Sequence, residues 1–424
     1  MLLLYADTVG AKMASVGIRA VELARTLRPH CAGVTVAAAA VTDPPDDGVR
    51  YVTFRPHDPG SLAPHLLDVD LVVAQPQWPA HMALLRRSGA RLIFDLYDPE
   101  TFPTIEHLAG RPAPLRRLMS AYSIDRVAEA MRIASHVICA TERQRDLWLG
   151  VLLAGRAITP ALYDRDPSLR SVIDVVPFGV PRDPPRPGAV DPIRARFPAL
   201  GARDRIVLWN GGIWPWFDAP SAIAAVGALA GRDPGVRLVF MGATSFGPAQ
   251  RATREARAAA GPLLDRAVFF NDVWVPYAER DGWLLAADCA LSLHHEHLET
   301  RLSSRTRLLD CFWAGLPVVC TRGDEFAERI ERDGLGATVG PLDGAGAARA
   351  LETVLDRGRA AYAPALARAA ADHSWERVAA PLVAMVTATG GRLGPPAALR
   401  VTERVRNLAY RAARGALGGV PRLD

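Results

Sequence analysis

Lysine is almost absent from this sequence of 424 residues: of its 50 basic residues only Lys12 is a lysine, and the others are arginines. A site that elsewhere uses lysine must therefore use arginine or backbone N–H groups. A strong charge excess is also missing, because the formal net charge is only +5. So small an excess argues against a nucleic acid as partner, since such partners need a strongly basic surface.

Paired cysteines and long apolar runs are missing too. The five cysteines are scattered and never spaced C-x-x-C, which argues against a disulfide framework or a zinc site and favours a reducing compartment. No apolar run reaches the roughly 18 residues of a membrane-spanning helix. The first residues also lack the basic region and cleavage signal of a secretory leader. We expect a cytoplasmic protein, at most peripheral to the inner face of the cell membrane.

Short apolar runs alternate along the chain with longer amphipathic ones, and half of all residues are apolar. This alternation predicts parallel β-α-β units with helices on both faces of the sheets. In the first half we expect strands at 2–5, 33–38, 71–74, 91–95, 136–140 and 171–176, with helices at 15–27 and 121–134. In the second half we expect strands at 205–209, 237–241, 267–270, 289–293, 317–320 and 337–339. Helices expected there are 218–230, 247–260, 278–286, 305–314, 326–333 and 344–357.

A proline-rich stretch without periodicity, 177–192, separates the two series and is typical of a stiff linker. The length also exceeds what one core supports, since single cores stop growing at roughly 250–300 residues. We therefore predict two tandem, Rossmann-like, doubly wound α/β domains, 1–180 and 193–375. Residues 181–192 would link them, and 376–424 would form a separate tail.

The tail contains a predicted helix, 397–417, with two different faces. At 100° per residue its arginines share one side and its apolar residues the other. The helix either packs on a domain with its basic face in solvent or binds an anionic membrane surface. The arginines of the basic face are Arg400, Arg404, Arg411 and Arg414.

Two features of the first half could carry chemistry. Gly10 and Gly17 bracket a loop before a helix, which suits a phosphate or a closely approaching ligand. Their spacing is not G-x-G-x-x-G, so the loop could equally be a plain turn. Asp95 and Asp98 follow a strand, where ligands of open parallel sheets bind. They could accept hydrogen bonds from sugar hydroxyls, act as a base or cap the next helix.

The second half begins with a strand that ends in Asn210-Gly211-Gly212. Two glycines let a backbone approach a ligand closely. Three aromatic residues follow, namely Trp214, Trp216 and Phe217. They could form a stacking wall for a ligand or a hydrophobic plug between domains, and so many bulky residues on one loop favour an exposed role.

The stretch 291–324 is the richest in polar side chains. We expect a polar loop and then a helix that Ser303 or Ser304 caps. Arginines at the start of that helix predict an anion site, because free N–H groups, the helix dipole and guanidinium groups act together. The loop histidines invite a metal interpretation, but adjacent side chains diverge and no second ligand cluster is visible. They are His294, His295 and His297.

Several segments together resemble a known family. The tandem α/β halves, the glycine turn, VPFGV before the linker, VICATERQRDLW and above all LLDCFWAGLPVVCT are similar to the retaining GT-B glycosyltransferases of glycosyltransferase family 4. The resemblance covers nearly the whole chain. It implies a nucleotide-diphosphate sugar bound mainly by the second domain, in a cleft between the domains, and an acceptor bound mainly by the first. It also implies transfer with retention at the anomeric carbon, no metal or other cofactor, and C-terminal helices that cross back to the first domain.

The sequence departs from the family pattern in two places. The E-x7-E signature has Asp310 where its second glutamate holds the ribose, and Leu302 where the first would stand; Glu299 is the nearest acidic substitute. The arginine and lysine that follow the glycine turn are missing from GGIWPWFDA. Those cations neutralise the diphosphate, so other cations must serve here. The candidates are Arg301, Arg305 and Arg307, with Arg305 best placed at the helix N-terminus.

The resemblance and the residues together predict a glycosyltransferase of bacterial glycan or natural-product biosynthesis. Its acceptor would be a glycan, a lipid-linked or a small molecule. The predicted catalytic residues are Asp95, Asp98, Glu299 and Arg305. The predicted donor-binding residues are Gly10, Gly17, Gly211, Gly212, Trp214, Arg301, Ser304, Arg305, Thr306 and Asp310.

Two alternatives remain open. The first is another enzyme on the same frame, such as an epimerase, a phosphorylase or a pseudo-glycosyltransferase. A phosphorylase is disfavoured because it usually needs a lysine-bound cofactor, and Lys12 lies in the wrong half. The second is a degenerate scaffold of a glycan-assembly complex, which would bind no nucleotide.

Overall fold

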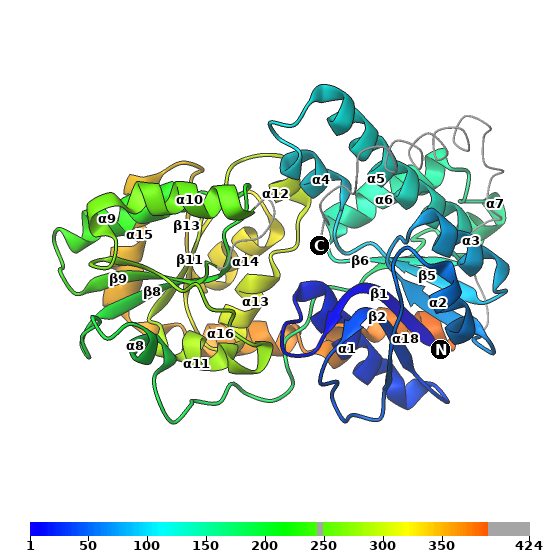
Figure 1. The fold of residues 1–424 in the computed structure, drawn as a ribbon, viewed down its shortest axis with the longest axis horizontal. Helices are drawn as coiled ribbons and strands as arrows, with labels where there is room; N and C mark the ends of the chain where they lie inside the picture. The colour runs from blue at the N-terminus through cyan, green and yellow to red at the C-terminus, as the bar shows by residue number, and fades with distance from the viewer. Residues whose placement is uncertain (244–248, 389–424) are drawn as a thin grey trace. The chain divides into compact units, whose positions relative to one another are not determined.

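The computed structural model describes residues 1–243 and 249–388 and is drawn in Figure 1. Contacts along the chain divide it into two compact units. The first holds Met1–Phe178 together with the described residues from Trp375 to Ala388, and the second holds Gly179–Ser374. Each unit is a parallel α/β fold, as the alternating pattern predicts.

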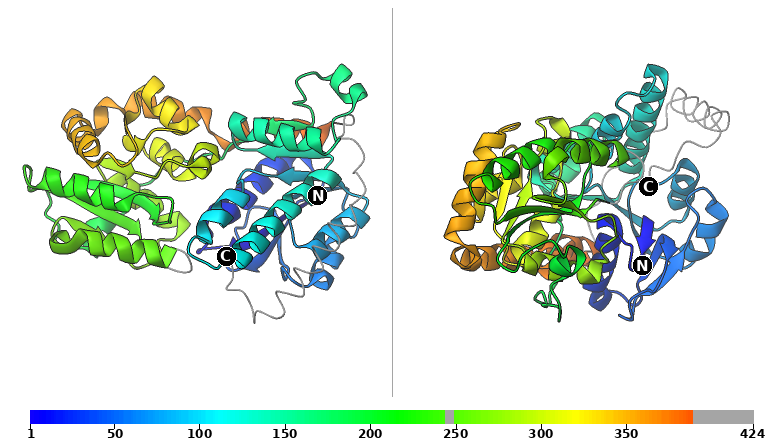
Figure 2. Two further views of the ribbon diagram at one scale, coloured as in Figure 1. Left: turned by 90° about the horizontal axis from the view of Figure 1, so that it is seen from above. Right: turned by 60° about the vertical axis from the view of Figure 1, so that its left-hand side comes forward.

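The first unit is built on a seven-stranded sheet in the order β3-β2-β1-β4-β5-β6-β7. The order reverses at β1, which pairs in parallel with both β2 and β4, so the sheet is doubly wound. Helices lie on both of its faces (Figure 2). The strands are β1 (Leu2–Val9), β2 (Thr35–Val41), β3 (Arg50–Thr53), β4 (Leu71–Ala74), β5 (Arg91–Asp95), β6 (His136–Cys139) and β7 (Ile173–Val175). The helices are α1 (Ser15–Leu27), α2 (Pro59–Leu62), α3 (Pro79–Arg87), α4 (Thr101–His107), α5 (Ala113–Ile133), α6 (Glu142–Ala154), α7 (Pro160–Arg165), α17 (Trp375–Val378) and α18 (Ala380–Thr387).

The second unit is built on a six-stranded sheet in the order β10-β9-β8-β11-β12-β13. It reverses in the same way at β8, which pairs in parallel with β9 and β11. The strands are β8 (Arg205–Gly212), β9 (Val236–Gly242), β10 (Val268–Phe270), β11 (Cys289–Ser292), β12 (Val318–Thr321) and β13 (Gly336–Val339). The helices are α8 (Pro192–Arg196), α9 (Ala219–Ala230), α10 (Ala249–Ala260), α11 (Arg280–Ala286), α12 (Leu298–Leu302), α13 (Thr306–Trp313), α14 (Glu325–Asp333), α15 (Gly344–Arg357) and α16 (Ala363–Asp372).

Most predicted elements are confirmed, because buried strands and amphipathic helices carry a strong local pattern. β4 and β5 coincide with the predictions, as do α1 and α15. The edge strand β3 was not predicted, since it is short and only partly buried. Helix α5 begins at Ala113, well before the predicted 121, and β8 continues to Gly212, which pairs with Gly242 of β9.

The proline-rich segment is held against the second unit by two hydrogen bonds. Trp313 Nε1 donates to the carbonyl of Asp183 over 2.8 Å. The backbone N–H of Arg186 donates to Asp281 over 3.1 Å. The segment therefore has fixed attachment points on the unit that follows it.

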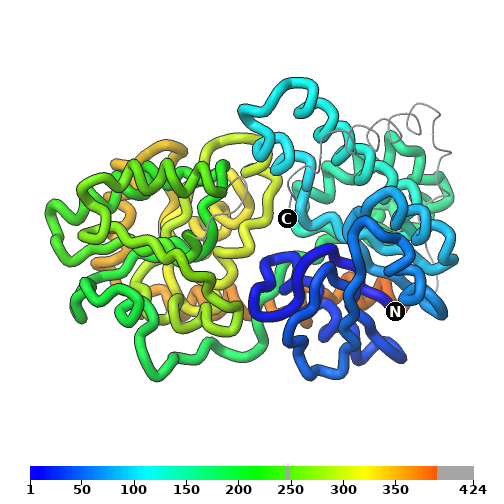
Figure 3. Tube along the Cα trace, in the orientation of Figure 1, coloured from blue at the N-terminus to red at the C-terminus, as the bar shows by residue number. Residues whose placement is uncertain are grey.

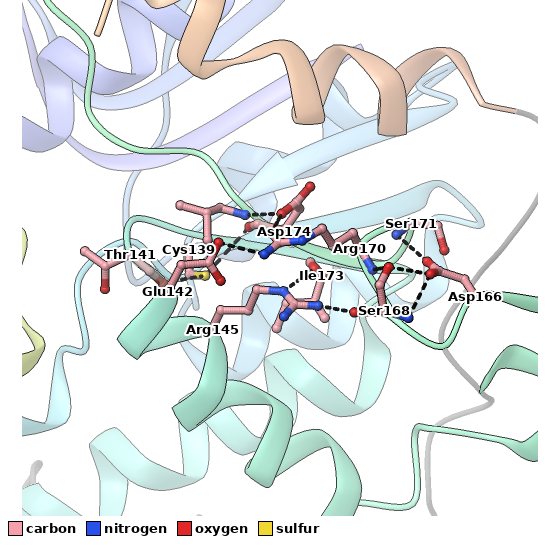
Figure 4. Close-up of polar contacts among 11 residues, drawn as sticks. Cys139, Thr141, Glu142, Arg145, Asp166, Ser168, Arg170, Ser171, Ile173 and Asp174 are labelled. Atoms are coloured by element: carbon pink, nitrogen blue, oxygen red, sulfur yellow. Dashed lines mark hydrogen bonds and ion pairs between the residues drawn. The ribbon is translucent and has the colours of Figure 1, made fainter. Parts of the chain in front are cut away.

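A polar network fastens the chain between α6 and β7 in the first unit, as Figure 4 shows. Arg170 donates to Glu142 over 2.7 Å and also pairs with Asp174. Arg145 donates to the carbonyl of Ile173 over 3.0 Å. Asp166 accepts from the backbone N–H of Ser171 over 2.8 Å. These contacts join the loop before β7 to both neighbouring elements.

The described end of the chain returns to the first unit, where α18 appears in orange in Figures 1 and 3. Trp375 packs on Phe178 with 5.0 Å between ring centroids. Arg91 donates to the carbonyls of Val386 and Ala388 over 2.5 and 2.7 Å. The predicted basic helix 397–417 lies outside the described residues. Within residues 1–243 and 249–388, no helix is long and apolar enough to cross a membrane.

Candidate ligand site

The carboxyl ends of β8, β11 and β12 form the centre of the second sheet, at the point where its strand order reverses. This is the ligand position of open parallel sheets. Backbone contacts hold the following loops together: Asp218 N–H donates to the carbonyl of Leu293 over 2.9 Å, and His295 N–H donates to that of Trp216 over 3.0 Å. The chain after β8 and the chain after β11 therefore meet here.

Helix α13 starts beside these loops, but not with the predicted serine cap. Its N-cap residue is Arg305, and in the described chain no side chain caps it. The prediction of Ser303 or Ser304 as cap was wrong, because the short helix α12 ends at Leu302 and takes Ser303 as its own C-cap. At the start of α13 the backbone N–H of Thr306 donates to the carbonyl of Ser304 over 2.9 Å, and that of Leu308 donates to the carbonyl of Arg305 over 3.0 Å.

Arg305 is fixed in place by a carboxylate from another element. Its Nε lies 2.6 Å from Asp324 Oδ2, and the two side chains are 5% and 1% exposed. Asp324 also caps α14 by accepting from the N–H of Ala327 over 2.7 Å. Both Nη atoms of Arg305 are buried and have no hydrogen-bond partner among the described residues. Two strong donors are thus oriented and unused.

Arg307 lies two residues further along the chain, in α13, and contacts the glycine turn. Its Nη2 donates to the carbonyl of Gly212 over 3.0 Å, and its guanidinium lies 4.0 Å from the ring centroid of Phe217. Its Nη1 is buried and has no partner in the described part of the chain. Burial, and then the charge of Arg305, lower the pKa of Arg307 to about 9.

Buried acceptors lie on the same strand ends. His294 places Nδ1 at 3.2 Å from the carbonyl of His295, so Nδ1 carries the proton and Nε2 is an acceptor. Burial, and then the charge of Arg305, lower the pKa of His294 to about 2, so the ring is neutral at ordinary pH. Further polar side-chain atoms are buried without a partner among the described residues: His294 Nε2, Asn210 Oδ1, Asp218 Oδ2, Ser292 Oγ and Ser304 Oγ.

Asp310 lies further into α13 and is paired with Arg280 of α11. Arg280 Nε is 3.2 Å from Asp310 Oδ1. The same guanidinium lies 3.5 Å from the ring centroid of Tyr277 and 4.9 Å from that of Trp313. One third of the Asp310 side chain remains exposed. The carboxylate is thus held by one partner and accessible to another.

The remaining predicted residues of this half lie around the same two helices. Glu299 belongs to α12, is 5% exposed and has Oε2 at 3.8 Å from His297 Nδ1. Arg301 is exposed, whereas Leu302 is buried as a core residue. Trp214 stacks on Trp216 with 5.5 Å between ring centroids. Ser304 and Thr306 flank Arg305 and are partly exposed.

In the described chain, no group of three or more histidine, cysteine or acidic side chains is arranged so that it could hold a metal ion. The three loop histidines have other contacts: His294 Nδ1 lies against a carbonyl, and His297 Nδ1 accepts from the N–H of Thr300 over 3.3 Å. Sequence reasoning missed Asp324 and His294 as site residues. In the sequence, an aspartate just before a helix, such as Asp324, indicates a helix cap and not a binding site.

In the first unit, Asp95 is engaged in a fully buried ion pair. Its Oδ2 accepts from Arg19 Nε over 2.6 Å and from the hydroxyl of Tyr5 over 2.7 Å, and its Oδ1 accepts from Arg19 Nη2 over 3.0 Å. Arg19 also donates to the carbonyls of Val176 and Pro177. Asp95 therefore ties β1 and α1 to the end of the sheet. Its predicted contact with substrate stays a prediction.

The other predicted residues of this unit lie at the loop ends. Gly10 has φ +134° and a Cβ there would lie 1.8 Å from the carbonyl oxygen of Thr42. A Cβ at Gly17 would lie 2.2 Å from that of Thr8. Close backbone packing thus accounts for both glycines. Asp98 is exposed and does not cap α4, whose N-cap residue is Glu100.

Comparison with known proteins identifies the fold of this chain. No family model matches the sequence, and no curated protein sequence matches it. Among solved structures, WaaG, a glycosyltransferase of lipopolysaccharide biosynthesis, is 15% identical with a TM-score of 0.61 over 92% of this chain and 100% of its own. Anabaena HepE in complex with UDP-glucose is 16% identical with a TM-score of 0.62, over 89% and 97%. The trehalose-6-phosphate synthase OtsA is 14% identical with a TM-score of 0.66, over 92% and 99%. The chain therefore has the GT-B fold of two Rossmann-like domains.

Proposed function

We propose that this protein is a glycosyltransferase that moves a sugar from a nucleotide-diphosphate sugar to an acceptor hydroxyl with retention of configuration. One observation carries the proposal: oriented, unused guanidinium donors and unused acceptors are buried together at the strand ends of the second unit. Unused donors call for an anion, and unused acceptors call for hydroxyl groups. A sugar diphosphate supplies both.

Arg305 would act on the leaving group. Transfer breaks the bond between the anomeric carbon and a diphosphate oxygen, and negative charge then develops on that oxygen. Donors fixed before the reaction stabilise such charge without reorganising. Asp324 holds Arg305 by Nε, so both Nη atoms would reach the phosphate oxygens. The start of α13 would add a favourable dipole, and Ser304 and Thr306 would add their hydroxyl groups.

The donor's other parts would bind along the same helices. Asp310 would accept hydrogen bonds from the ribose hydroxyls, and its pairing with Arg280 would orient it. Glu299 and His294 would accept hydrogen bonds from the hydroxyls of the transferred sugar. Trp214 would stack on the donor, and the exposed Arg301 would add positive charge. We propose that no metal takes part, because arginines supply the charge.

The first unit would bind the acceptor, with Asp98 at its surface and the loop from Gly10 to Gly17 beside it. Asp95 would act there through its position, since Arg19 holds both of its oxygens. The acceptor would be a glycan, a lipid-linked or a small molecule. HepE is known with UDP-glucose, so UDP-glucose is the first donor to test. Contact of the tail with a membrane stays a proposal, because 389–424 lie outside the described residues.

A thermal-shift experiment tests the function. UDP, GDP, ADP, dTDP and CDP are each added to the protein without metal and again with magnesium. A ligand at 100 times its dissociation constant stabilises the folded state by about 2.7 kcal/mol, which a melting curve resolves. We expect one nucleotide to raise the melting temperature without metal and the Arg305→Met variant to lose that shift.

Arg357→Met serves as the matched control, because Arg357 is an exposed arginine that packs on Tyr362, at 4.8 Å from its ring centroid. It should keep the full shift. If none of the five diphosphates shifts the wild-type protein, the transferase is excluded in favour of the non-binding scaffold. A shift that needs magnesium would contradict the metal-free site.

A further inference from the structure

Arg307 occupies the space directly above the glycine turn of β8. Its Nη2 donates to the carbonyl of Gly212 over 3.0 Å. In turn, the backbone carbonyl of Arg307 accepts from Asn210 Nδ2 over 2.7 Å. The first turn of α13 is therefore fixed to the end of β8 through this one residue, from both its side chain and its backbone.

The glycines provide the room that this guanidinium needs. Gly211 has φ +141°, and a Cβ on it would lie 3.2 Å from Cζ and Nη2 of Arg307. A side chain at Gly211 would therefore be strained by its backbone and pressed against the guanidinium. The guanidinium of Arg307 therefore explains why position 211 is a glycine. The sequence had suggested instead that a ligand approaches the backbone there.

The structure shows no carboxylate paired with Arg307 among the described residues. Its contacts among the described residues are a carbonyl, the ring of Phe217 at 4.0 Å and the ring of Trp209 at 6.0 Å. The nearby Arg305 is positive as well, and in the described part of the chain its one ion-pair partner is Asp324. Two guanidinium groups thus share one carboxylate. A charged group whose Nη1 is buried without a partner is costly, and a bound anion would remove that cost.

We propose that Arg307 is the second cation of the diphosphate site: its free Nη1 binds one phosphoryl group while Arg305 binds the other. The proposal rests on the proposed function and deepens it. A diphosphate fits two cations better than a monophosphate does, so the pair would select for the second phosphate group. The ring of Phe217 holds the guanidinium of Arg307 in place, since arginine stacks on aromatic faces.

The test compares ligands that differ only in phosphate number. Dissociation constants of uridine, UMP and UDP, and of the guanosine and adenosine series, are measured by calorimetry for the wild type, Arg307→Gln and Arg307→Lys. Glutamine has a neutral N–H donor and no charge, whereas lysine keeps the charge. We expect Arg307→Gln to bind the diphosphate about ten- to a hundredfold more weakly, the worth of a charge-assisted hydrogen bond.

Binding of the nucleoside alone should change less than threefold, and lysine should restore part of the loss. A merely structural Arg307 would weaken nucleoside and diphosphate equally, and that result would overturn the proposal. Unchanged diphosphate binding in Arg307→Gln would overturn it too. Circular dichroism establishes that each variant is folded, and Arg357→Met is again the control. If the wild type binds no diphosphate, the proposed function fails, which is a distinguishable outcome.

Discussion

Arg305 and Arg307 belong to one turn of α13, yet different surroundings give them different tasks. Arg305 is nearly fully buried and carries a carboxylate partner, Asp324. Arg307 is partly exposed and rests on a carbonyl and an aromatic ring. The sequence identified both as cations near a helix start. It did not reveal Asp324, because an aspartate before a helix is ordinarily a cap.

Asp95 is a predicted site residue that the structure pairs with another side chain. Its place after a strand predicts contact with a ligand, but the structure gives it a buried pair with Arg19. Arg19 lies on α1, where a lone arginine in a helix usually faces solvent. Nothing local distinguishes such a residue from an exposed one. Removing either partner of a buried pair leaves an uncompensated charge, which typically costs about 3–5 kcal/mol.

The lowered pKa of His294 predicts how the free energy of unfolding changes in acid. Its pKa of about 2 in the folded protein lies below the ordinary 6.5. Below pH 6.5 the unfolded chain therefore takes up a proton that the folded chain refuses, so the free energy of unfolding falls with falling pH. In His294→Gln this loss between pH 6.5 and 5 should be smaller by about 1–2 kcal/mol. Urea unfolding at both pH values measures it, and identical losses in variant and wild type would contradict the neutral imidazole.

At the scale of elements, the site depends on where α12 ends and α13 begins. The break between them leaves Arg305 as an N-cap residue whose side chain makes no capping hydrogen bond in the described chain. The sequence predicted the helix and its arginines correctly, but it assigned the cap to a serine. The turn that the chain makes between the helices decides this, and it follows from packing of buried Leu302 rather than from capping preference.

The proline-rich segment gives a second prediction at this scale. Trp313 Nε1 donates to the carbonyl of Asp183, and Trp313→Phe removes only that bond. A hydrogen bond of this kind contributes about 1 kcal/mol, so the segment should open about fivefold more often. Trypsin should then cleave after Arg182 about fivefold faster, as followed by mass spectrometry. Trp216→Phe is the control, and equal rates in all three proteins would show that the segment is held by other contacts.

At the scale of the whole molecule, the chain folds into two units and its described end belongs to the first of them. Trp375, which is 3% exposed, packs there on Phe178, and Arg91 holds the end of α18. The proposed donor site lies in the second unit. Ligand binding and C-terminal packing should therefore affect different parts of the protein.

Calorimetry can separate the two units. Trp375→Ala should destabilise the first unit by about 3–5 kcal/mol, as loss of a buried tryptophan does, and should lower its transition. A bound nucleoside diphosphate should raise the transition of the second unit in both wild type and variant. A single transition that shifts as a whole in both experiments would mean that the units unfold together.

The sequence by itself determined the alternation of strands and helices, the two units and the segment in which we propose the anion site. These follow from apolar periodicity, turn residues and a helix start, all of which are local in the chain. Only the tertiary structure decided which polar groups meet. Arg307 reaches Gly212 of β8, Arg305 reaches Asp324 at the start of α14, and Asp95 reaches Arg19 of α1. These pairs join segments that are far apart in the sequence. Burial strengthens the interaction within each pair, and no local sequence pattern indicates which two residues will meet.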